Sequence, residues 1–123
     1  MRMKCHIFFH KFDTAKINQE GWRGTEGQLY LRLTSPLLPN QSIDALSDAI
    51  SHKKFKYIGS IFAESHEETF MTLQNAFKSH PLNNRSMMTG DIVICDGTGK
   101  IVEPYDWNNL KSDQTQALLQ LIK

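Results

Sequence analysis

The stretch GDIVICDGTGKIVEPYDW, residues 90–107, restricts the fold of this chain more than any other part of the sequence. Two apolar runs flank Asp96 and Gly97, and an Asp-Gly pair in that position is typical of a β-hairpin because both residues tolerate a positive φ. We predict a strand over residues 91–95, a tight turn, and a returning strand over about 100–105. This part of the chain therefore forms antiparallel β-structure.

Three further segments have the composition of strands. Residues 3–10 place apolar side chains at alternate positions, which is the period-two pattern of a half-buried strand. Residues 28–34 alternate in the same way and are closed by Pro36, so they predict a second strand. Residues 56–65 are apolar in both registers, which is typical of a strand covered on both faces. With the hairpin, these segments give about five strands.

Helical signals separate these strands. Residues 40–54 begin with capping candidates and continue with apolar side chains at helical spacing. Ser65 and Glu68 form a capping box for a second helix, which ends before Pro81. The apolar stripe of that helix consists of Phe70, Leu73 and Phe77. Residues 112–122 predict a short final helix.

The order of these elements indicates an α+β fold. Residues 13–28 are polar and rich in glycine, so we expect a long loop there. Single-sided strands and helices bury their apolar faces against one another in two layers. We therefore predict a mixed or antiparallel sheet of about five strands with two to three helices packed on one face.

The composition favours one domain and gives no dominant charge. A chain of 123 residues with 40% hydrophobic residues can close one core, so we predict a single globular domain over residues 1–123. Residues 1–60 carry nine Lys and Arg against five Asp and Glu, and residues 61–123 carry five against eight. This asymmetry indicates a modestly dipolar molecule, and nothing in the balance requires nucleic acid as a partner.

The sequence predicts a cytoplasmic protein. The N-terminal apolar run is too short for a signal peptide, and no segment approaches the roughly 20 apolar residues of a membrane span, so we expect no membrane partner. A reducing compartment favours Cys5 and Cys95 as two buried free thiols. A disulfide between them is the alternative if they face each other on adjacent strands.

Motifs for catalysis, metals and cofactors do not occur. Cys5 and His6 point to opposite faces of the predicted strand, and no paired short spacing of zinc ligands is present. The chain lacks a nucleophile elbow and an H-E-x-x-H motif, and the DGTGK turn lacks the P-loop pattern. We predict no catalytic residue, no metal site and no cofactor.

Residues 52–57, HKKFKY, leave a nucleic-acid-binding module open as an alternative. Basic and aromatic side chains alternate there, which is a composition used to hold a phosphate backbone while bases stack. The residues that would bind are Lys53, Lys54, Lys56 and Tyr57. The structural interpretation is that the lysines complement the end of a helix dipole and the aromatic residues enter the core.

The loop before the hairpin leaves two interpretations open. Arg85 and Asp91 flank a tight loop at Gly90, and an ion pair between them would clasp that loop. The functional alternative is a small-ligand or enzyme site near Arg85, Ser86 and Asp91. Exposed aromatic and cationic side chains are also typical of protein interfaces. The candidate partner contacts are Trp22, Arg23, Arg85, Met87, Met88, Tyr105 and Trp107.

Residues 80–107 resemble part of a known family. The segment reads HP, then RSMMTGDIV, then DG and a returning strand that ends in aromatic residues. It resembles the C-terminal part of YodL-like small proteins, which phages, plasmids and integrated elements carry and whose pattern is R-S-M-S-x-G-D-V-V. Met88 stands where the family has serine, and PYDW replaces an aromatic-glycine-aromatic ending.

The resemblance implies a genetic setting rather than a reaction. Small proteins of mobile elements commonly bind a host or element-encoded protein, often to inhibit a host defence protein. We therefore expect a non-catalytic, protein-binding accessory protein of a phage or plasmid. The oligomeric state stays open, because an exposed sheet edge also permits self-association.

Overall fold

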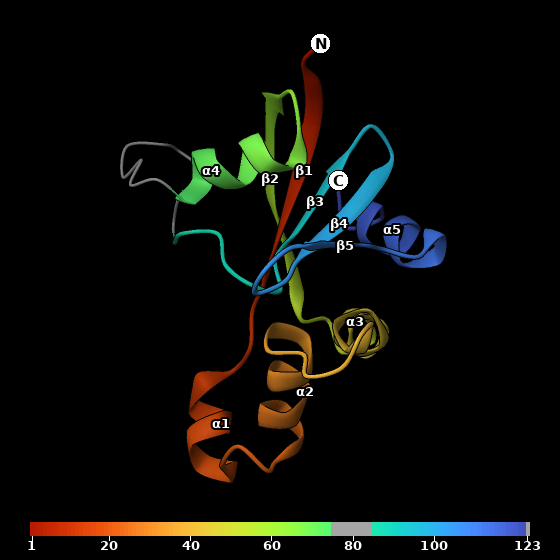
Figure 1. The fold of residues 1–123 in the computed structure, drawn as a ribbon. Helices are drawn as coiled ribbons and strands as arrows, with labels where there is room; N and C mark the ends of the chain where they lie inside the picture. The colour runs from red at the N-terminus through yellow and green to blue at the C-terminus, as the bar shows by residue number, and fades with distance from the viewer. Residues whose placement is uncertain (75–84, 123) are drawn as a thin grey trace.

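The computed structural model describes residues 1–74 and 85–122 (Figure 1). In chain order the elements are β1 (Met3–His10), α1 (Thr14–Glu20), α2 (Thr25–Thr34), α3 (Gln41–Ser51), β2 (Phe55–Ala63), α4 (His66–Gln74), β3 (Ile92–Cys95), β4 (Thr98–Val102), β5 (Trp107–Asn109) and α5 (Ser112–Leu119). The strands form one sheet in the order β2-β1-β3-β4-β5, and every neighbouring pair is antiparallel. The predicted α+β class is therefore confirmed.

The sheet is buried on both faces along β1. Phe8 points into one core, which also contains residues of α2, α3 and α5. Ile7 and Phe9 point into a second core, where Leu73 of α4 packs. Figure 1 shows α4 and α5 on opposite sides of the sheet. Of the three predicted helices, α3 and α5 share one face with α2, which the sequence did not predict as a helix, whereas α4 covers the opposite face.

The predicted second strand over residues 28–34 is wrong, because this segment belongs to α2. Leu29 and Leu33 lie on the same face of the helix, four residues apart, and both are buried. Over so short a run, alternating leucines fit a helix as well as a strand. Packing of α2 against α3 decides between the two periods.

The predicted long loop over residues 13–28 is also wrong over most of its length. Asp13 caps α1, since its side chain accepts a hydrogen bond from the Lys16 backbone N–H at 3.0 Å. Gly21, with φ of 80°, ends the helix. The connection to α2 is then only a few residues long, and it carries Trp22 and Arg23.

The hairpin is confirmed, but its second strand is shorter than predicted. Asp96 and Gly97 have φ of 51° and 80°, so both adopt the left-handed conformation that a two-residue hairpin turn needs. β4 ends at Val102 rather than near Tyr105. A turn follows, in which the Glu103 backbone N–H donates to the Asp106 carbonyl at 2.8 Å.

The interpretation of the cysteines as free thiols is wrong. Cys5 and Cys95 are directly opposite each other in the β1–β3 pairing, with Cα atoms 4.3 Å apart, and they form a disulfide bond. Their side chains lie in the core beneath α4. The cause is the pairing register, which a sequence pattern alone does not determine.

Part of the second predicted helix lies outside the described residues. α4 begins as the capping box predicts, because the Glu68 backbone N–H donates to Ser65 Oγ at 3.0 Å. Phe77 and Pro81 lie beyond Gln74, in residues that the structure does not describe. In the described parts of the chain, no helix is both long and apolar enough to cross a bilayer.

Candidate functional site

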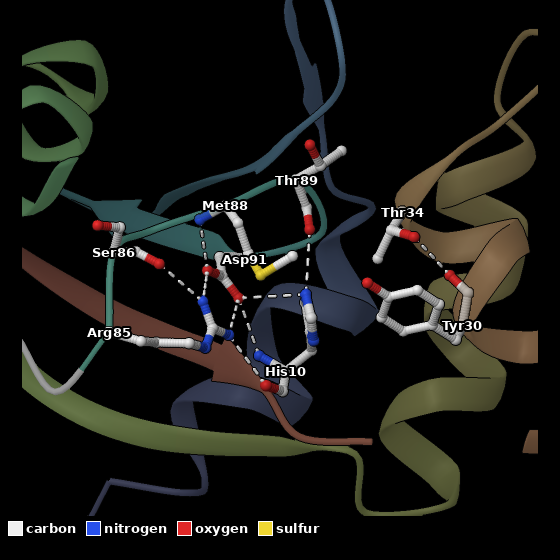
Figure 2. A network of polar contacts seen from close by, with 8 residues as sticks. All are labelled: His10, Tyr30, Thr34, Arg85, Ser86, Met88, Thr89 and Asp91. Carbon is white, nitrogen blue, oxygen red and sulfur yellow. Dashed lines mark hydrogen bonds and ion pairs between the residues drawn. The ribbon is translucent and has the colours of Figure 1, made fainter. Parts of the chain in front are cut away.

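Asp91 is the centre of a buried polar network between the end of β1 and the loop before β3 (Figure 2). The Arg85 guanidinium donates to both of its carboxylate oxygens, from Nη1 to Oδ2 at 2.7 Å and from Nη2 to Oδ1 at 2.9 Å. The backbone N–H groups of His10 and Met88 donate to the same oxygens at 3.0 and 2.8 Å. These four hydrogen bonds satisfy the buried carboxylate, which is 0% exposed.

Arg85 uses most of its donors inside this network. It also donates to the backbone carbonyls of His10 and Ser86, each at 3.0 Å, and it lies over the Phe9 ring at 4.2 Å. Figure 2 shows the Ser86 hydroxyl pointing away from Asp91. The predicted clasp is therefore present, and the structure does not join Arg85 and Ser86 into a ligand-facing pair.

His10 connects this network to Tyr30 of α2 and to Phe12. Its Nε2 lies 3.0 Å from the Thr89 carbonyl, which can only accept, so Nε2 carries the proton. Burial lowers the pKa of His10; the nearby Arg85 charge lowers it further, while Asp91 and the Thr89 carbonyl act in the opposite direction. The ring is thus neutral near pH 7, and it packs edge-on against Tyr30.

The loop over residues 85–90 needs glycine at its last position. Gly90 has φ of 91°, and a Cβ there would lie 2.9 Å from Thr34 Cγ2 and 3.0 Å from His10 Cδ2. The interpretation of Met87 as a partner contact is wrong, because it is 0% exposed and packs in the core with Leu73. Met88, the next residue, is only half-buried.

A hollow of about 470 Å³ lies beside the network, and we call it the aromatic hollow. It is lined by His10, Lys11, Phe12, Thr14, Ile17, Asn18, Trp22, Tyr30, Arg85 and Met88. The Phe12 and Trp22 rings each contact the Tyr30 ring, with centroids 5.3 and 5.9 Å apart. Trp22 is 54% exposed, so its indole forms an open wall of the hollow. The lining carries two cationic side chains and no carboxylate.

A second ion pair holds the base of α2 against the sheet. Glu26 is 3% exposed and accepts from the Lys54 ammonium at 2.7 Å and from the Asp13 backbone N–H at 2.8 Å. Burial opposes ionisation of Glu26, but these two hydrogen bonds together with the positive charges of Lys54 and Lys16 outweigh it, so the pKa of Glu26 lies below its ordinary value. The pair fixes the start of α1, and with it one wall of the aromatic hollow.

A second hollow, of about 340 Å³, lies between α4 and the turn before β5, and we call it the acidic hollow. It is lined by Glu67, Phe70, Met71, Val102, Glu103, Pro104, Tyr105, Asp106 and Trp107. The Trp107 ring packs edge-on against Phe70 at 5.9 Å between centroids. Tyr105 is fully exposed at the rim.

The basic segment over residues 52–57 does not form one surface. Lys54 is engaged with Glu26 and lies over the Phe12 ring. Tyr57 is half-buried and packs against Phe8, with its hydroxyl 3.0 Å from His6 Nδ1. Lys53 and Lys56 are exposed. The aromatic part of the structural interpretation is confirmed, since Phe55 is buried in the core and Tyr57 packs against it, whereas Lys54 pairs with Glu26.

The structure divides the predicted partner contacts into two groups. Trp22, Arg85 and Met88 line the aromatic hollow, and Tyr105 and Trp107 line the acidic hollow. Arg23 is exposed beside Trp22 but lines neither hollow.

Sequence reasoning missed His10, Phe12 and Tyr30 as parts of a site. The only local signal of His10 and Tyr30 was their place on the side of two predicted strands opposite the assigned apolar face, and Phe12 lay beyond the end of the first strand. The packing of α2 beside the end of β1, which brings the Tyr30 ring against His10 and Phe12, carries no such signal.

Comparisons with known proteins do not assign this α+β domain to a family. No family model matches the chain, and neither a curated protein nor a solved structure matches it. The geometry of the two hollows therefore carries the functional argument.

Proposed function

We propose that this chain is a non-catalytic, protein-binding accessory protein of a mobile element, a phage or plasmid. It acts stoichiometrically, by occupying the surface of a host defence protein and inhibiting it. The resemblance of residues 85–93 to YodL-like proteins supports the genetic setting. The aromatic hollow supports the mode of action.

The observation that carries the proposal is the convergence of three predicted contacts, Trp22, Arg85 and Met88, in one hollow. Trp22 follows α1 and Met88 lies just before β3, and both line the aromatic hollow. An open tryptophan beside a half-buried methionine and further aromatic rings matches the composition of interface anchor sites. The hollow suits an apolar side chain of a partner that packs against the exposed face of Trp22.

The test is capture of a partner from a host lysate with the tagged protein, with and without nuclease. We expect one host protein at close to equal amounts, retained after nuclease treatment. Trp22→Ala removes the open wall and should weaken capture at least about tenfold, which is the effect of losing an interface anchor. Leu38→Ala is the matched control, because Leu38 is 67% exposed and lies outside both hollows.

Two results would overturn the proposal. Equal loss of the captured protein in Trp22→Ala and Leu38→Ala would show that the aromatic hollow is not the contact. Capture that disappears with nuclease would move the function to the exposed lysines of the HKKFKY segment. That alternative predicts steep weakening with salt and loss of binding in a Lys53→Ala/Lys56→Ala variant.

A small-ligand protein is the second candidate, and the volume of the aromatic hollow favours it. About 470 Å³ lies within the range of small-molecule sites, and the lining combines apolar rings with a few polar groups. Thermal unfolding against a library of small aromatic acids tests this function. A saturable rise in the unfolding temperature that Trp22→Ala abolishes would favour the ligand over the protein partner.

A further inference from the structure

We propose that the acidic hollow is a second docking surface, and that it takes a lysine- or arginine-rich segment of a partner polypeptide. It shares no lining residue with the aromatic hollow. The inference therefore goes beyond the proposed function and stands or falls separately.

The walls of the acidic hollow come from two parts of the chain that are far apart in sequence. Phe70 and Met71 of α4 form one side, and the turn over residues 103–106 with Trp107 forms the other. Met71 is 56% exposed, and Tyr105 is fully exposed. These apolar and aromatic surfaces remain uncovered by the described part of the chain.

The charges at the hollow all have one sign. Glu67, Glu103 and Asp106 line it, and none of its lining residues is cationic. Glu103 is engaged with the Ser42 hydroxyl and with Asn108. Glu67 has no polar side-chain partner among the described residues, and Asp106 uses one oxygen for the Trp107 backbone N–H at 2.8 Å. Carboxylate oxygens therefore remain open to a ligand.

Carboxylates beside exposed aromatic rings select a cationic side chain. The face of a tyrosine or tryptophan ring attracts an ammonium or guanidinium group, and a nearby carboxylate forms an ion pair with it. The aliphatic stem of the same side chain can lie on Met71 and Phe70. A bare metal ion does not fit, because residues 1–74 and 85–122 contain no group of three His, Cys, Asp or Glu side chains arranged to hold one.

The probe is an acetylated, amidated Arg-Gly-Arg-Gly-Arg-Gly peptide, titrated into the isotope-labelled full chain and followed by NMR. We expect saturable shifts of the Trp107 indole N–H and of the backbone over residues 103–107. The variant Glu67→Gln/Asp106→Asn removes two exposed ion pairs. Each of them contributes only modestly, so their combined loss should weaken binding about tenfold. Both residues are exposed, so the variant folds.

The control variant removes the same charge elsewhere. Glu20→Gln/Asp44→Asn neutralises two exposed carboxylates on α1 and α3, and it should change the affinity less than about twofold. Equal weakening in both variants would overturn the inference, because the peptide would then follow the overall charge. Shifts centred on the Trp22 indole would also overturn it. So would shifts at Trp107 that appear on concentrating the free protein, since the occupant would be a second copy.

Discussion

The two hollows use similar rings but are held together in different ways. The aromatic hollow depends on Asp91, a fully buried carboxylate that joins the end of β1 to the loop before β3. The acidic hollow depends on a short turn and on one helix, and its carboxylates lie at the surface or near it. The comparison teaches that one site is held by a buried ion pair, while the other is formed where a helix and a turn, each a local structure, pack against each other at the surface.

The hollows also differ in charge, in the direction that the sequence predicts. The first half of the chain has the excess of basic residues and contributes Lys11 to the aromatic hollow, whereas the second cation there, Arg85, comes from the second half and is paired with Asp91. The second half has the excess of acidic residues and contributes all three carboxylates of the acidic hollow. The two hollows therefore carry charged side chains of opposite sign and suit partners of opposite charge.

Removing the disulfide has the largest expected effect on stability, and it affects the sheet beneath both hollows. Cys5 and Cys95 are 90 residues apart, and closing so long a loop stabilises the native state by about 4 to 5 kcal/mol in the chain-entropy account. A Cys5→Ala/Cys95→Ala variant should lose up to that amount in urea unfolding. An unchanged free energy of unfolding, with free thiols detected in the native wild type, would show that the bond does not form.

Replacing an aspartate by asparagine should lower the free energy of unfolding strongly at the aromatic hollow and very little at the acidic hollow. Asp91→Asn places an amide among four donors and should lower the free energy of unfolding by about 3 kcal/mol. Asp106→Asn, at an exposed position, should change it by less than about 0.5 kcal/mol. Urea unfolding monitored by circular dichroism measures both. Equal losses would contradict the contrast.

The two tryptophans should differ in the opposite sense, by a smaller amount, because the more buried ring lies at the acidic hollow. Trp107 is half-buried against Phe70 and His66, so Trp107→Ala should cost about 2 kcal/mol. Trp22 is the more exposed, and Trp22→Ala should cost about 1 kcal/mol or less. A greater loss for Trp22 in the same unfolding assay would mean that the aromatic hollow is closed in solution.

Acidification should weaken the aromatic hollow by a modest amount. Burial lowers the pKa of His10 below its ordinary value of 6.5, so the unfolded chain takes up that proton first. Stability contributed by the neutral ring is therefore complete above pH 6.5 and is lost as the pH falls, by at most about 1.4 kcal/mol per pH unit for one proton. His6 and His66, whose pKa values burial also lowers, contribute in the same direction.

The variant His10→Gln measures how much of the loss of stability in acid comes from protonation of His10. An amide can still donate to the Thr89 carbonyl but does not titrate in this range. The free energy of unfolding should then fall less steeply with acid than in the wild type. If the free energy of unfolding depends on pH equally in His10→Gln and in the wild type, groups other than His10 cause the loss of stability in acid.

The sequence predicts the acidic hollow better than the aromatic one, for a physical reason. The hairpin and the capping box at Ser65 are local patterns, and they correctly predict β3, its turn and the start of α4, whereas the turn over residues 103–106 and β5 were not predicted. The Arg85–Asp91 clasp was also predictable, because both residues flank one short loop.

The aromatic hollow depends on contacts that no local pattern contains. Leucines at alternate positions were compatible with a strand and with a helix, and only the packing of α2 against α3 distinguishes them. The prediction therefore placed Tyr30 on the outer side of a strand, whereas it lies in α2 with its ring against His10. The disulfide was missed for the same reason, since it depends on the β1–β3 register.

The central claim is that the two hollows present opposite charges, and the two tryptophans of the chain report on it directly. Fluorescence quenching of Trp22→Phe and Trp107→Phe by iodide and by caesium, at constant ionic strength, compares the two sites one at a time. We expect the ratio of iodide to caesium quenching to be at least about twofold higher when Trp22 is the remaining fluorophore than when it is Trp107, and the difference to shrink in high salt. Equal ratios, or the reverse order, would contradict the account.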